Sequence, residues 1–246
     1  RCKHAYVYDY VTYGHLGKYR CPACGYSRPE PEIAVSAVTV TDAEHSEVVF
    51  DDGKKRIPAT ICLPGGYNIY NACAAMAAGK LLGLKEETVA ASLASFSCGF
   101  GRMEKFRIHD VDVRMILIKN PAGCNQVLNY LTQLREPFTF VACLNDRAQD
   151  GVDVSWIWDV DFERLTAMGE QIASIDVSGR RAEDMAMRFK YAGFPTERLR
   201  VNKDYRSLIE NAVALGKPVY VMPTYTAMLA LRSTISKAYG YKEFWE

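Results

Sequence analysis

Apolar and polar residues follow different patterns in the two parts of this 246-residue chain. In the first part, residues 33–63 hold three short β-rich runs, and the Asp-Asp-Gly sequence at residues 51–53 is a good hairpin turn between the last two. Residues 67–82 and 85–96 then carry apolar residues at helical spacing. The first part is therefore predicted to contain a group of strands followed by two helices. Small residues on the first helix (Ala72, Ala75, Met76 and Gly79) predict a face suited to close packing.

From about residue 107 onward, short apolar runs alternate with helical patterns. The predicted strands are residues 113–118, 138–144, 172–177, 199–201 and 219–222, and the predicted helices are residues 126–134, 182–192, 205–214 and 227–236. Such alternation is typical of an α/β domain with a parallel sheet and helices on both faces. Residues 97–106, with Gly99 and Gly101, resemble a linker, so we place a domain boundary near residue 98, between domains 1–98 and 99–246.

The composition excludes several classes of protein. With 49% hydrophobic and 24% charged residues, the chain is not a disordered protein. Its 30 Lys and Arg against 29 Asp and Glu give no basic footprint for nucleic acid. The uncharged stretch of residues 57–79 holds prolines, glycines and asparagines, which favours strand, turn and buried helix over a membrane span. The chain shows no signal-peptide pattern, so we expect a cytoplasmic protein.

The eight cysteines divide into two groups. Five lie in apolar segments and are expected to be small buried hydrophobic residues: Cys62, Cys73, Cys98, Cys124 and Cys143. The others, Cys2, Cys21 and Cys24, lie in a Tyr-rich segment at residues 1–31. A reducing compartment is expected for all of them, so disulfides are not.

The Cys-Pro-Ala-Cys-Gly sequence of residues 21–25 has the form of a zinc knuckle, in which two thiolates three positions apart bind one metal ion. A redox role is disfavoured because Tyr-Ser-Arg-Pro follows instead of a helix. Cys2 is the expected third ligand, and the residues between form the hairpin of a zinc ribbon. A fourth ligand is supplied by His4 or His15, or by a cysteine three residues before Cys2 if the chain is truncated.

Several motifs resemble those of Mur ligases. The Gly-Gly-Tyr-Asn-Ile-Tyr-Asn sequence from Gly65 resembles their Gly-x-His-Asn-x-x-Asn signature, and Gly-Arg-Met-Glu at residues 101–104 matches the Gly-Arg-x-Glu that joins their central and C-terminal domains. Lys119-Asn120-Pro121 stands at the end of their Asp-Tyr-Ala-His-Asn-Pro motif. This resemblance implies nucleotide-binding roles for Asn68, Asn71, Arg102 and Lys119. Asn68 is alternatively a helix N-cap.

The departures from those motifs fit one branch, the MurT family. The sequence Asp-Gly-Val-Asp-Val-Ser-Trp-Ile-Trp-Asp at residues 150–159 is the most specific of the runs that resemble it. Membership implies a Mur ligase fold, in which residues 1–98 are the end of a central domain with an inserted zinc ribbon and residues 99–246 are a Rossmann-like C-terminal domain. It also implies that the missing fourth cysteine and the phosphate-binding loop lie upstream of residue 1.

The resemblance also implies a function in peptidoglycan synthesis. MurT-type subunits use ATP and Mg²⁺ to activate the α-carboxylate of D-Glu in lipid II as an acyl phosphate. A glutamine amidotransferase partner, GatD, supplies ammonia that converts it to D-isoglutamine. The resemblance implies that an Asp of the ligase subunit completes the partner's catalytic triad. The candidates here are Asp150, Asp153 and Asp159, of which we favour the first two, and Trp156 and Trp158 could anchor the interface. Alternatively, these acids cap helices or pair with arginines.

No Gly-x-x-x-x-Gly-Lys-Ser/Thr sequence occurs in the chain, although this loop usually cradles the phosphates of ATP. We therefore expect the chain alone to bind or hydrolyse ATP poorly. The sequence is also compatible with two other functions: a Mur-like ligase acting on another acidic peptide, and a non-catalytic zinc-ribbon interaction module.

Overall fold

The computed structural model describes residues 2–13, 16–42, 44–96 and 101–242. The chain forms two compact units, Arg1–Phe96 and Ser97–Glu246. The predicted boundary at residue 98 lies outside the described residues. Within the described ranges, no helix is both long and apolar enough to cross a membrane.

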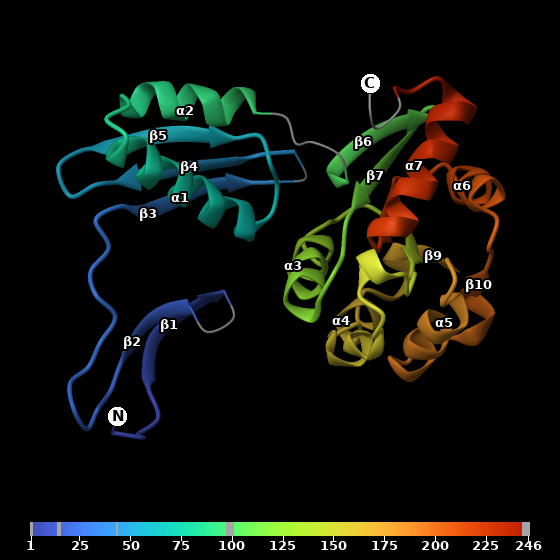
Figure 1. The fold of residues 1–246 in the computed structure, drawn as a ribbon, viewed down its shortest axis with the longest axis horizontal. Coiled ribbons are helices and arrows are strands. Elements are labelled where there is room, and N and C mark those ends of the chain that lie inside the picture. The colour runs from blue at the N-terminus through green and yellow to red at the C-terminus, as the bar shows by residue number, and fades with distance from the viewer. Residues whose placement is uncertain (1, 14–15, 43, 97–100, 243–246) are drawn as a thin grey trace. The chain divides into compact units, whose positions relative to one another are not determined.

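The first unit contains two antiparallel sheets (Figure 1). One is a hairpin of β1 (Val7–Tyr13) and β2 (Leu16–Arg20). The other has the order β3 (Ala34–Thr41), β4 (Ser46–Asp51), β5 (Arg56–Ile61). Every second residue of β4 and β5 is buried, as expected for a sheet with one face in a core. The three predicted β-rich runs therefore form the three strands of one antiparallel sheet.

Two helices, α1 (Gly66–Leu81) and α2 (Glu86–Ser95), complete this unit. Phe50 and Met76 are fully buried in its core. Helix α1 approaches α2 closely, because a Cβ added at Gly79 would lie 2.6 Å from Val89 Cγ2. The predicted small-residue face is thus correct for Ala72, Met76 and Gly79, which are buried, and wrong for Ala75, which is exposed.

The second unit is built on a six-stranded sheet of order β10-β9-β8-β11-β7-β6. The strands are β6 (Arg102–Ile108), β7 (Val111–Ile116), β8 (Phe138–Cys143), β9 (Ile172–Ser178), β10 (Leu199–Val201) and β11 (Val219–Pro223). Strands β7 to β11 run parallel, which confirms the predicted sheet, and β6 joins β7 antiparallel at one edge.

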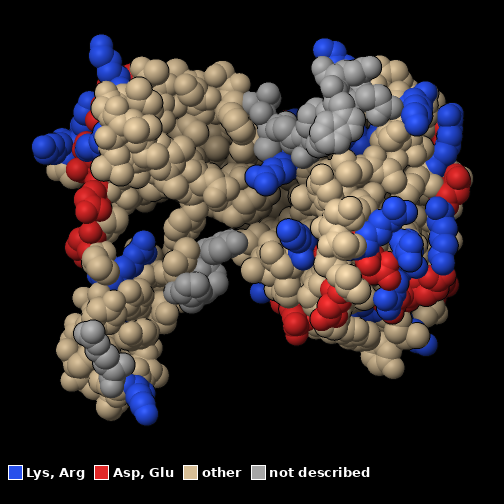
Figure 2. Space-filling view, in the orientation of Figure 1, with Lys and Arg blue, Asp and Glu red and all other residues tan. Residues whose placement is uncertain are grey.

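The helices of this unit are α3 (Pro121–Leu131), α4 (Glu163–Thr166), α5 (Ala182–Tyr191), α6 (Tyr205–Val213) and α7 (Tyr225–Tyr239). Short 3₁₀ turns lie between them: η1 (Ala148–Asp150), η2 (Ser155–Asp159), η3 (Gly169–Gln171) and η4 (Thr196–Arg198). On the face of this unit that Figure 2 shows, acidic and basic side chains lie close together.

Helices cover both faces of the sheet, as predicted. One hydrophobic cluster holds side chains of α3, α4 and α5 with alternate residues of β8 and β11, and a second cluster holds those of α6 and α7 with the other residues of the same strands. The segment that follows β8 therefore leads to helices on one face of the sheet, and the segment that follows the neighbouring β11 leads to a helix on the other face. Adjacent strands whose connections part in this way open a crevice at their carboxyl ends, where α/β proteins bind ligands.

The predicted linker at residues 97–106 is wrong where the structure describes it, because β6 begins at Arg102. Gly101, which suggested a linker, has φ +71° and a different role: a Cβ there would lie 1.9 Å from Met228 Sδ. Glu104 accepts hydrogen bonds from the Gly101 amide (3.0 Å) and from Arg232 Nε (2.9 Å). The Gly-Arg-Met-Glu motif thus fastens β6 to α7 through a largely buried ion pair.

The helix predicted at residues 126–134 begins earlier, at Pro121. The Asn120 side chain accepts a hydrogen bond from the Gly123 amide (2.8 Å). Pro121 occupies the first turn, where its missing amide hydrogen costs nothing because amides there have no helical acceptor. The Asn-Pro pair carried over from the Mur ligase motif is therefore a helix start in this chain.

Candidate functional site

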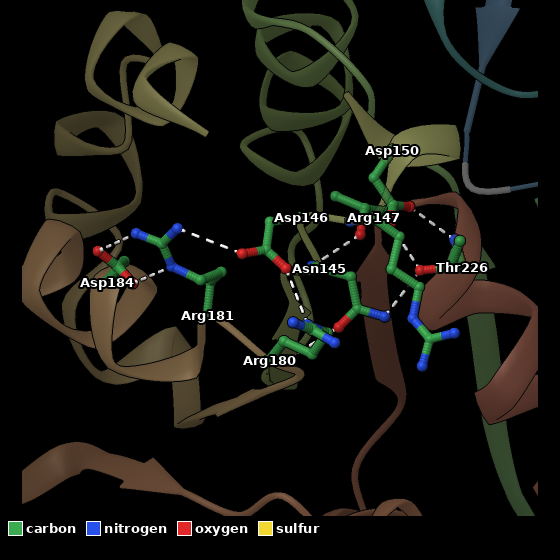
Figure 3. Close-up of polar contacts among 9 residues, drawn as sticks. Asn145, Asp146, Arg147, Asp150, Arg180, Arg181, Asp184 and Thr226 are labelled. Carbon is green, nitrogen blue, oxygen red and sulfur yellow. Dashed lines mark hydrogen bonds and ion pairs between the residues drawn. The ribbon is translucent and has the colours of Figure 1, made fainter. Parts of the chain in front are cut away.

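A buried carboxylate joins the loop after β8 to the start of α7 (Figure 3). Asp150 is 5% exposed. Its Oδ1 accepts from the Thr226 amide (2.7 Å), and its Oδ2 accepts from Thr226 Oγ1 (2.6 Å) and from the Arg147 amide (3.1 Å). The Thr226 amide belongs to the first turn of a helix, where amides lack helical acceptors. Asp150 supplies that acceptor and fixes the loop on the helix.

Asn145 joins a third segment to the same network (Figure 3). Its Oδ1 accepts from the Arg180 amide (2.9 Å) and its Nδ2 donates to Thr226 Oγ1 (2.9 Å). Gly179 makes this approach of β8 and β9 possible, because its φ is +93° and a Cβ there would lie 2.4 Å from the Leu144 oxygen. The carboxyl ends of β8, β9 and β11 are thereby held together.

Asp146 pairs with the first residues after β9. Its carboxylate lies 2.9 Å from Arg180 Nε and 3.3 Å from Arg181 Nη1. Partial burial raises the pKa of Asp146, but the hydrogen bonds and charges of Arg181 and Arg180 outweigh it and hold the net pKa below its ordinary value. Asp146 is therefore a carboxylate at neutral pH, committed to these two arginines.

These segments surround a pocket of about 780 Å³ at the carboxyl edge of the sheet. Its lining residues are Asn145, Arg147, Gln149, Gly179, Arg180, Lys203, Tyr205, Tyr225, Thr226, Leu229 and Ala230. None of these residues is among the ligands that the sequence predicts. A signal was present, since Asn145 and Thr226 follow the predicted strands at residues 138–144 and 219–222.

The three candidate triad acids differ in exposure. Asp150 is buried and already accepts three hydrogen bonds, whereas Asp153 and Asp159 are exposed. Asp153 accepts from the Ser155 amide (2.8 Å), and hydrogen bonds from that amide and the Ser155 hydroxyl lower the pKa of Asp153. Asp153 therefore lies just before the turn η2 and holds its first amide, and Asp159 is the last residue of that turn.

A buried arginine fixes the position of η2. Arg188 of α5, 3% exposed, donates to the main-chain oxygens of Ile157 (3.1 Å) and Val160 (2.6 Å). Of the two tryptophans, Trp156 is half-buried against the core, and Trp158 is 51% exposed and lies edge-on to Tyr191. The exposed Trp158 and Asp159 thus lie on a turn whose main chain a buried arginine holds by two hydrogen bonds.

The three candidate metal ligands are close together in the first unit. The thiols of Cys2, Cys21 and Cys24 all lie within 4.8 Å of one another, and Cys2 Sγ is 3.3 Å from Cys21 Sγ. Hydrogen bonds from the amides of Cys24 and Ala23 lower the pKa of Cys21 to about 7. The exposed His4 contacts the Cys2 oxygen through Nδ1 (3.0 Å), and His15 lies outside the described residues.

The remaining cysteines only partly match the prediction of burial. Cys124 and Cys143 are fully buried, and burial raises the pKa of both thiols. Cys73 is half-buried. The prediction is wrong for Cys62, which is exposed, and Cys98 lies outside the described residues.

The candidate nucleotide-binding residues occur in both units. Asn68 is buried and donates to the Pro64 oxygen (2.8 Å), and its Oδ1 accepts from Asn71 Nδ2 (3.3 Å). The alternative that Asn68 is an N-cap is wrong, because α1 begins at Gly66 with Gly65 as its N-cap. Arg102 and Lys119, in the second unit, are exposed.

The network around Asp150 makes a stability prediction. Replacing Asp150 by Asn leaves buried donors with poorer partners and is expected to lower the free energy of unfolding by about 1–3 kcal/mol. The control Asp159→Asn, at an exposed position, should stay within about 0.5 kcal/mol of wild type. Urea unfolding of the three proteins measures this. Equal stability of the two variants would show that Asp150 holds nothing in place.

Known proteins resemble this chain in sequence over most of its length. Residues 117–228 match the MurT ligase C-terminal family. The lipid II isoglutaminyl synthase subunit MurT of Streptococcus pneumoniae is 34% identical over 238 residues, which is 96% of this chain and 52% of that protein. The corresponding MurT of Staphylococcus aureus (strain COL) is 31% identical, over 97% of this chain and 52% of its own length. The chain thus spans about half the length of these relatives.

Solved structures show the same fold. A pseudomurein peptide ligase type C from Methanothermus fervidus matches with a TM-score of 0.65 and 20% identity, over 96% of this chain and 48% of that one. Folylpolyglutamate synthase of Mycobacterium tuberculosis matches with a TM-score of 0.60 and 18% identity, over 86% and 49%. The predicted Mur ligase-type α/β fold is therefore confirmed, the chain is similar to the MurT subunits over nearly its whole length, and its residues 117–228 match the MurT ligase C-terminal family.

Proposed function

We propose that the chain is part of the ligase subunit of a lipid II isoglutaminyl synthase. In this role it amidates the D-Glu α-carboxylate of lipid II with ammonia from a GatD-type glutamine amidotransferase, in the cytoplasm. The observation that carries the proposal is the 34% identity over 96% of the chain to a protein of that name. The Mur ligase-type fold supports ligase chemistry with ATP and Mg²⁺.

This chain would contact the nucleotide through residues outside a phosphate-binding loop, because its sequence contains no such loop. ATP, when bound, makes the carboxylate oxygen a leaving group. Asn68 would contact the base, and its amide is held in one orientation by Pro64 and Asn71. The exposed Arg102 and Lys119 are cations that suit phosphate or ribose contacts.

The turn η2 would supply the triad acid to the partner. A triad acid must reach the partner's His, and two candidates are exposed: Asp153, just before η2, and Asp159, its last residue. Arg188 holds the main chain of this turn. The exposed Trp158 beside Tyr191 suits a protein interface, where tryptophans contribute strongly. Asp150, the third candidate, would have to give up its contacts with Thr226 to take this role.

The three thiols fit a structural zinc site. Zinc binds thiolates in tetrahedral geometry, and three sulfur atoms within 4.8 Å of one another suit one ion. The lowered pKa of Cys21 favours the thiolate that zinc needs. Zinc here would join Cys2, before β1, to the knuckle after β2, and so close the hairpin.

The zinc proposal predicts metal content. The purified chain should carry zinc, and Cys21→Ser should lose most of it, because a buried ligand is removed. The control Cys62→Ser changes an exposed cysteine outside the cluster and should keep the metal. Elemental analysis after gel filtration measures this. A metal-free wild-type chain, or a Cys21→Ser variant with undiminished zinc, would rule the site out.

The main proposal predicts activity of a complex. The chain, with any residues that adjoin it in its own gene product, should co-purify with a glutaminase partner and amidate lipid II when given ATP and glutamine. Replacing the triad acid by Asn should lower the partner's glutaminase activity roughly 100-fold or more, because the His loses its orientation. Asp153→Asn, Asp159→Asn and Asp150→Asn are compared, with Asp161→Asn as the control from the same segment.

Two results would contradict these assignments separately. Undiminished glutaminase activity in all three variants would remove the triad role from this loop. A complex that hydrolyses glutamine but leaves lipid II unamidated would remove the proposed substrate.

A further inference from the structure

The hairpin of β1 and β2 carries a cluster of tyrosine rings that neither the zinc site nor the triad role uses. Tyr6 and Tyr19 have ring centroids 5.0 Å apart, and the Tyr26 centroid lies 6.2 Å from each of them. Tyr6 and Tyr26 are 47% and 56% exposed. We call these three rings the tyrosine face. Large exposed side chains that lie together mark a binding surface more often than scattered ones do.

The three rings form a surface and leave no slot between them. Neighbouring rings are tilted by 31–35° to one another, with centroids 5.0–6.2 Å apart. A nucleic-acid base stacked between two rings would need them roughly 7 Å apart, which is about twice the rise of a base step. The tyrosine face therefore suits a ligand that lies on it. The separation of its rings is comparable to that of adjacent sugar rings in an oligosaccharide.

The hairpin is basic, although the whole chain is nearly neutral. The described residues between positions 2 and 28 include one acid, Asp9, and four cations: Lys3, Lys18, Arg20 and Arg28. Arg28 adjoins the tyrosine face, since its amide donates to the Tyr19 oxygen (3.0 Å). Its Nη1 donates to the Gly17 oxygen (3.2 Å), and among the described residues it has no ion-pair partner. This excess of positive charge is complementary to a phosphorylated ligand.

The hairpin also contacts the helix that carries the proposed nucleotide contacts. Thr12 of β1 and Tyr70 of α1 share a hydrogen bond between their hydroxyl groups. Tyr70 directly precedes Asn71 in α1. From Tyr6 to Thr12 the extended chain covers roughly 20 Å, at about 3.4 Å per residue. A long ligand held at the tyrosine face can thus run along the hairpin toward the nucleotide contacts without leaving the first unit.

We propose that the tyrosine face and Arg28 bind the sugar head of the lipid-linked substrate, a disaccharide of N-acetylated amino sugars on a diphosphate. The C–H bonds of the sugar rings pack on the negative faces of the aromatic rings. The tyrosine hydroxyls exchange hydrogen bonds with the sugar hydroxyl and acetamido groups, and Arg28 donates to a phosphate oxygen. That lipid II is the source of this head group rests on the proposed function, whereas the binding of a phosphorylated amino sugar does not.

Fluorine NMR of the 246-residue chain labelled with fluorotyrosine tests the proposal on the intact hairpin. Tyr6→Phe, Tyr10→Phe and Tyr26→Phe each remove one signal and so assign it. The probes are N,N′-diacetylchitobiose, which has two sugar rings, and N-acetylglucosamine 1-phosphate, which has one ring and a phosphate. Both should shift the Tyr6 and Tyr26 signals with a dissociation constant of about 1 mM or tighter. The Tyr10 signal should not shift, because Tyr10, 52% exposed on the same hairpin, is not part of the tyrosine face.

Two variants and one control separate the contributions of ring and charge. Tyr26→Ala should weaken binding of both probes roughly tenfold, because one ring of the face is lost. The matched control Tyr10→Ala should bind like wild type. Arg28→Gln should weaken N-acetylglucosamine 1-phosphate roughly tenfold and leave N,N′-diacetylchitobiose unchanged, a difference that a merely structural role would not produce. Melting curves by circular dichroism verify folding, and if Tyr26→Ala does not fold, the titration of the unmutated chain decides.

Three results would overturn the proposal. Neither sugar shifts the Tyr6 and Tyr26 signals, or the Tyr10 signal shifts as much as they do, or an oligothymidylate binds more tightly than both sugars. The last result, with an affinity that falls steeply with salt, would assign the face to single-stranded nucleic acid.

The amidating complex links the site to the proposed substrate. There, Tyr26→Ala should raise the KM for lipid II roughly tenfold and leave the KM for ATP unchanged, and an unchanged KM for lipid II would refute the substrate role of the face. A complex that leaves lipid II unamidated, while the sugars still shift the Tyr6 and Tyr26 signals, would instead refute the proposed function and retain the sugar site.

Discussion

The contact between the Asp150 carboxylate and the first turn of α7 is the constraint on which the crevice of the second unit depends. The chain crosses from one face of the sheet to the other between β8 and β11, so the loops that follow these strands have no shared helix to hold them. Asp150 replaces that support with three hydrogen bonds to Thr226 and Arg147. Because the carboxylate is buried, each of these bonds contributes more than an exposed one would.

This constraint separates the acidic residues of the loop by role. Asp150 and Asp146 are turned inward onto Thr226 and onto two arginines, whereas Asp153 and Asp159 stay in contact with solvent. An acidic side chain that serves a partner protein must be exposed to solvent. One that organises a loop must accept hydrogen bonds from that loop and its neighbours. The same short segment therefore offers both kinds of acid, and Arg188 fixes the main chain of the turn that ends at Asp159.

The sequence predicts the fold of the second unit well. Strands that are buried on both faces appear in a sequence as short apolar runs, and amphipathic helices separate these runs. It fails at β6, where Gly101 and the polar Arg102 and Glu104 suggest a linker. There a tertiary contact decides the outcome, since Glu104 pairs with Arg232 in a helix that starts more than 100 residues later. The Asn-Pro start of α3 is missed for a different reason, because capping chemistry outweighs the apolar period.

The sequence predicts single features of the candidate site but not how they are arranged in space. The spacing of Cys2, Cys21 and Cys24 predicts one cluster, and the thiols do lie together. The acidic run at residues 150–159 is visible in the sequence, but nothing in it tells which carboxylate is buried. The pocket residues Arg147, Arg180 and Thr226 come from the segments that follow three different strands, and only the order of the strands brings them to one edge.

Hydrogen exchange at the Thr226 amide tests the role of Asp150 most directly. Amides in the first turn of a helix lack helical acceptors and ordinarily exchange fast. If Asp150 holds this amide, the wild-type chain should protect it about as well as amides in the middle of α7, and Asp150→Asn should lose that protection while the middle of the helix keeps it. Fast exchange of Thr226 in the wild-type chain would contradict the account.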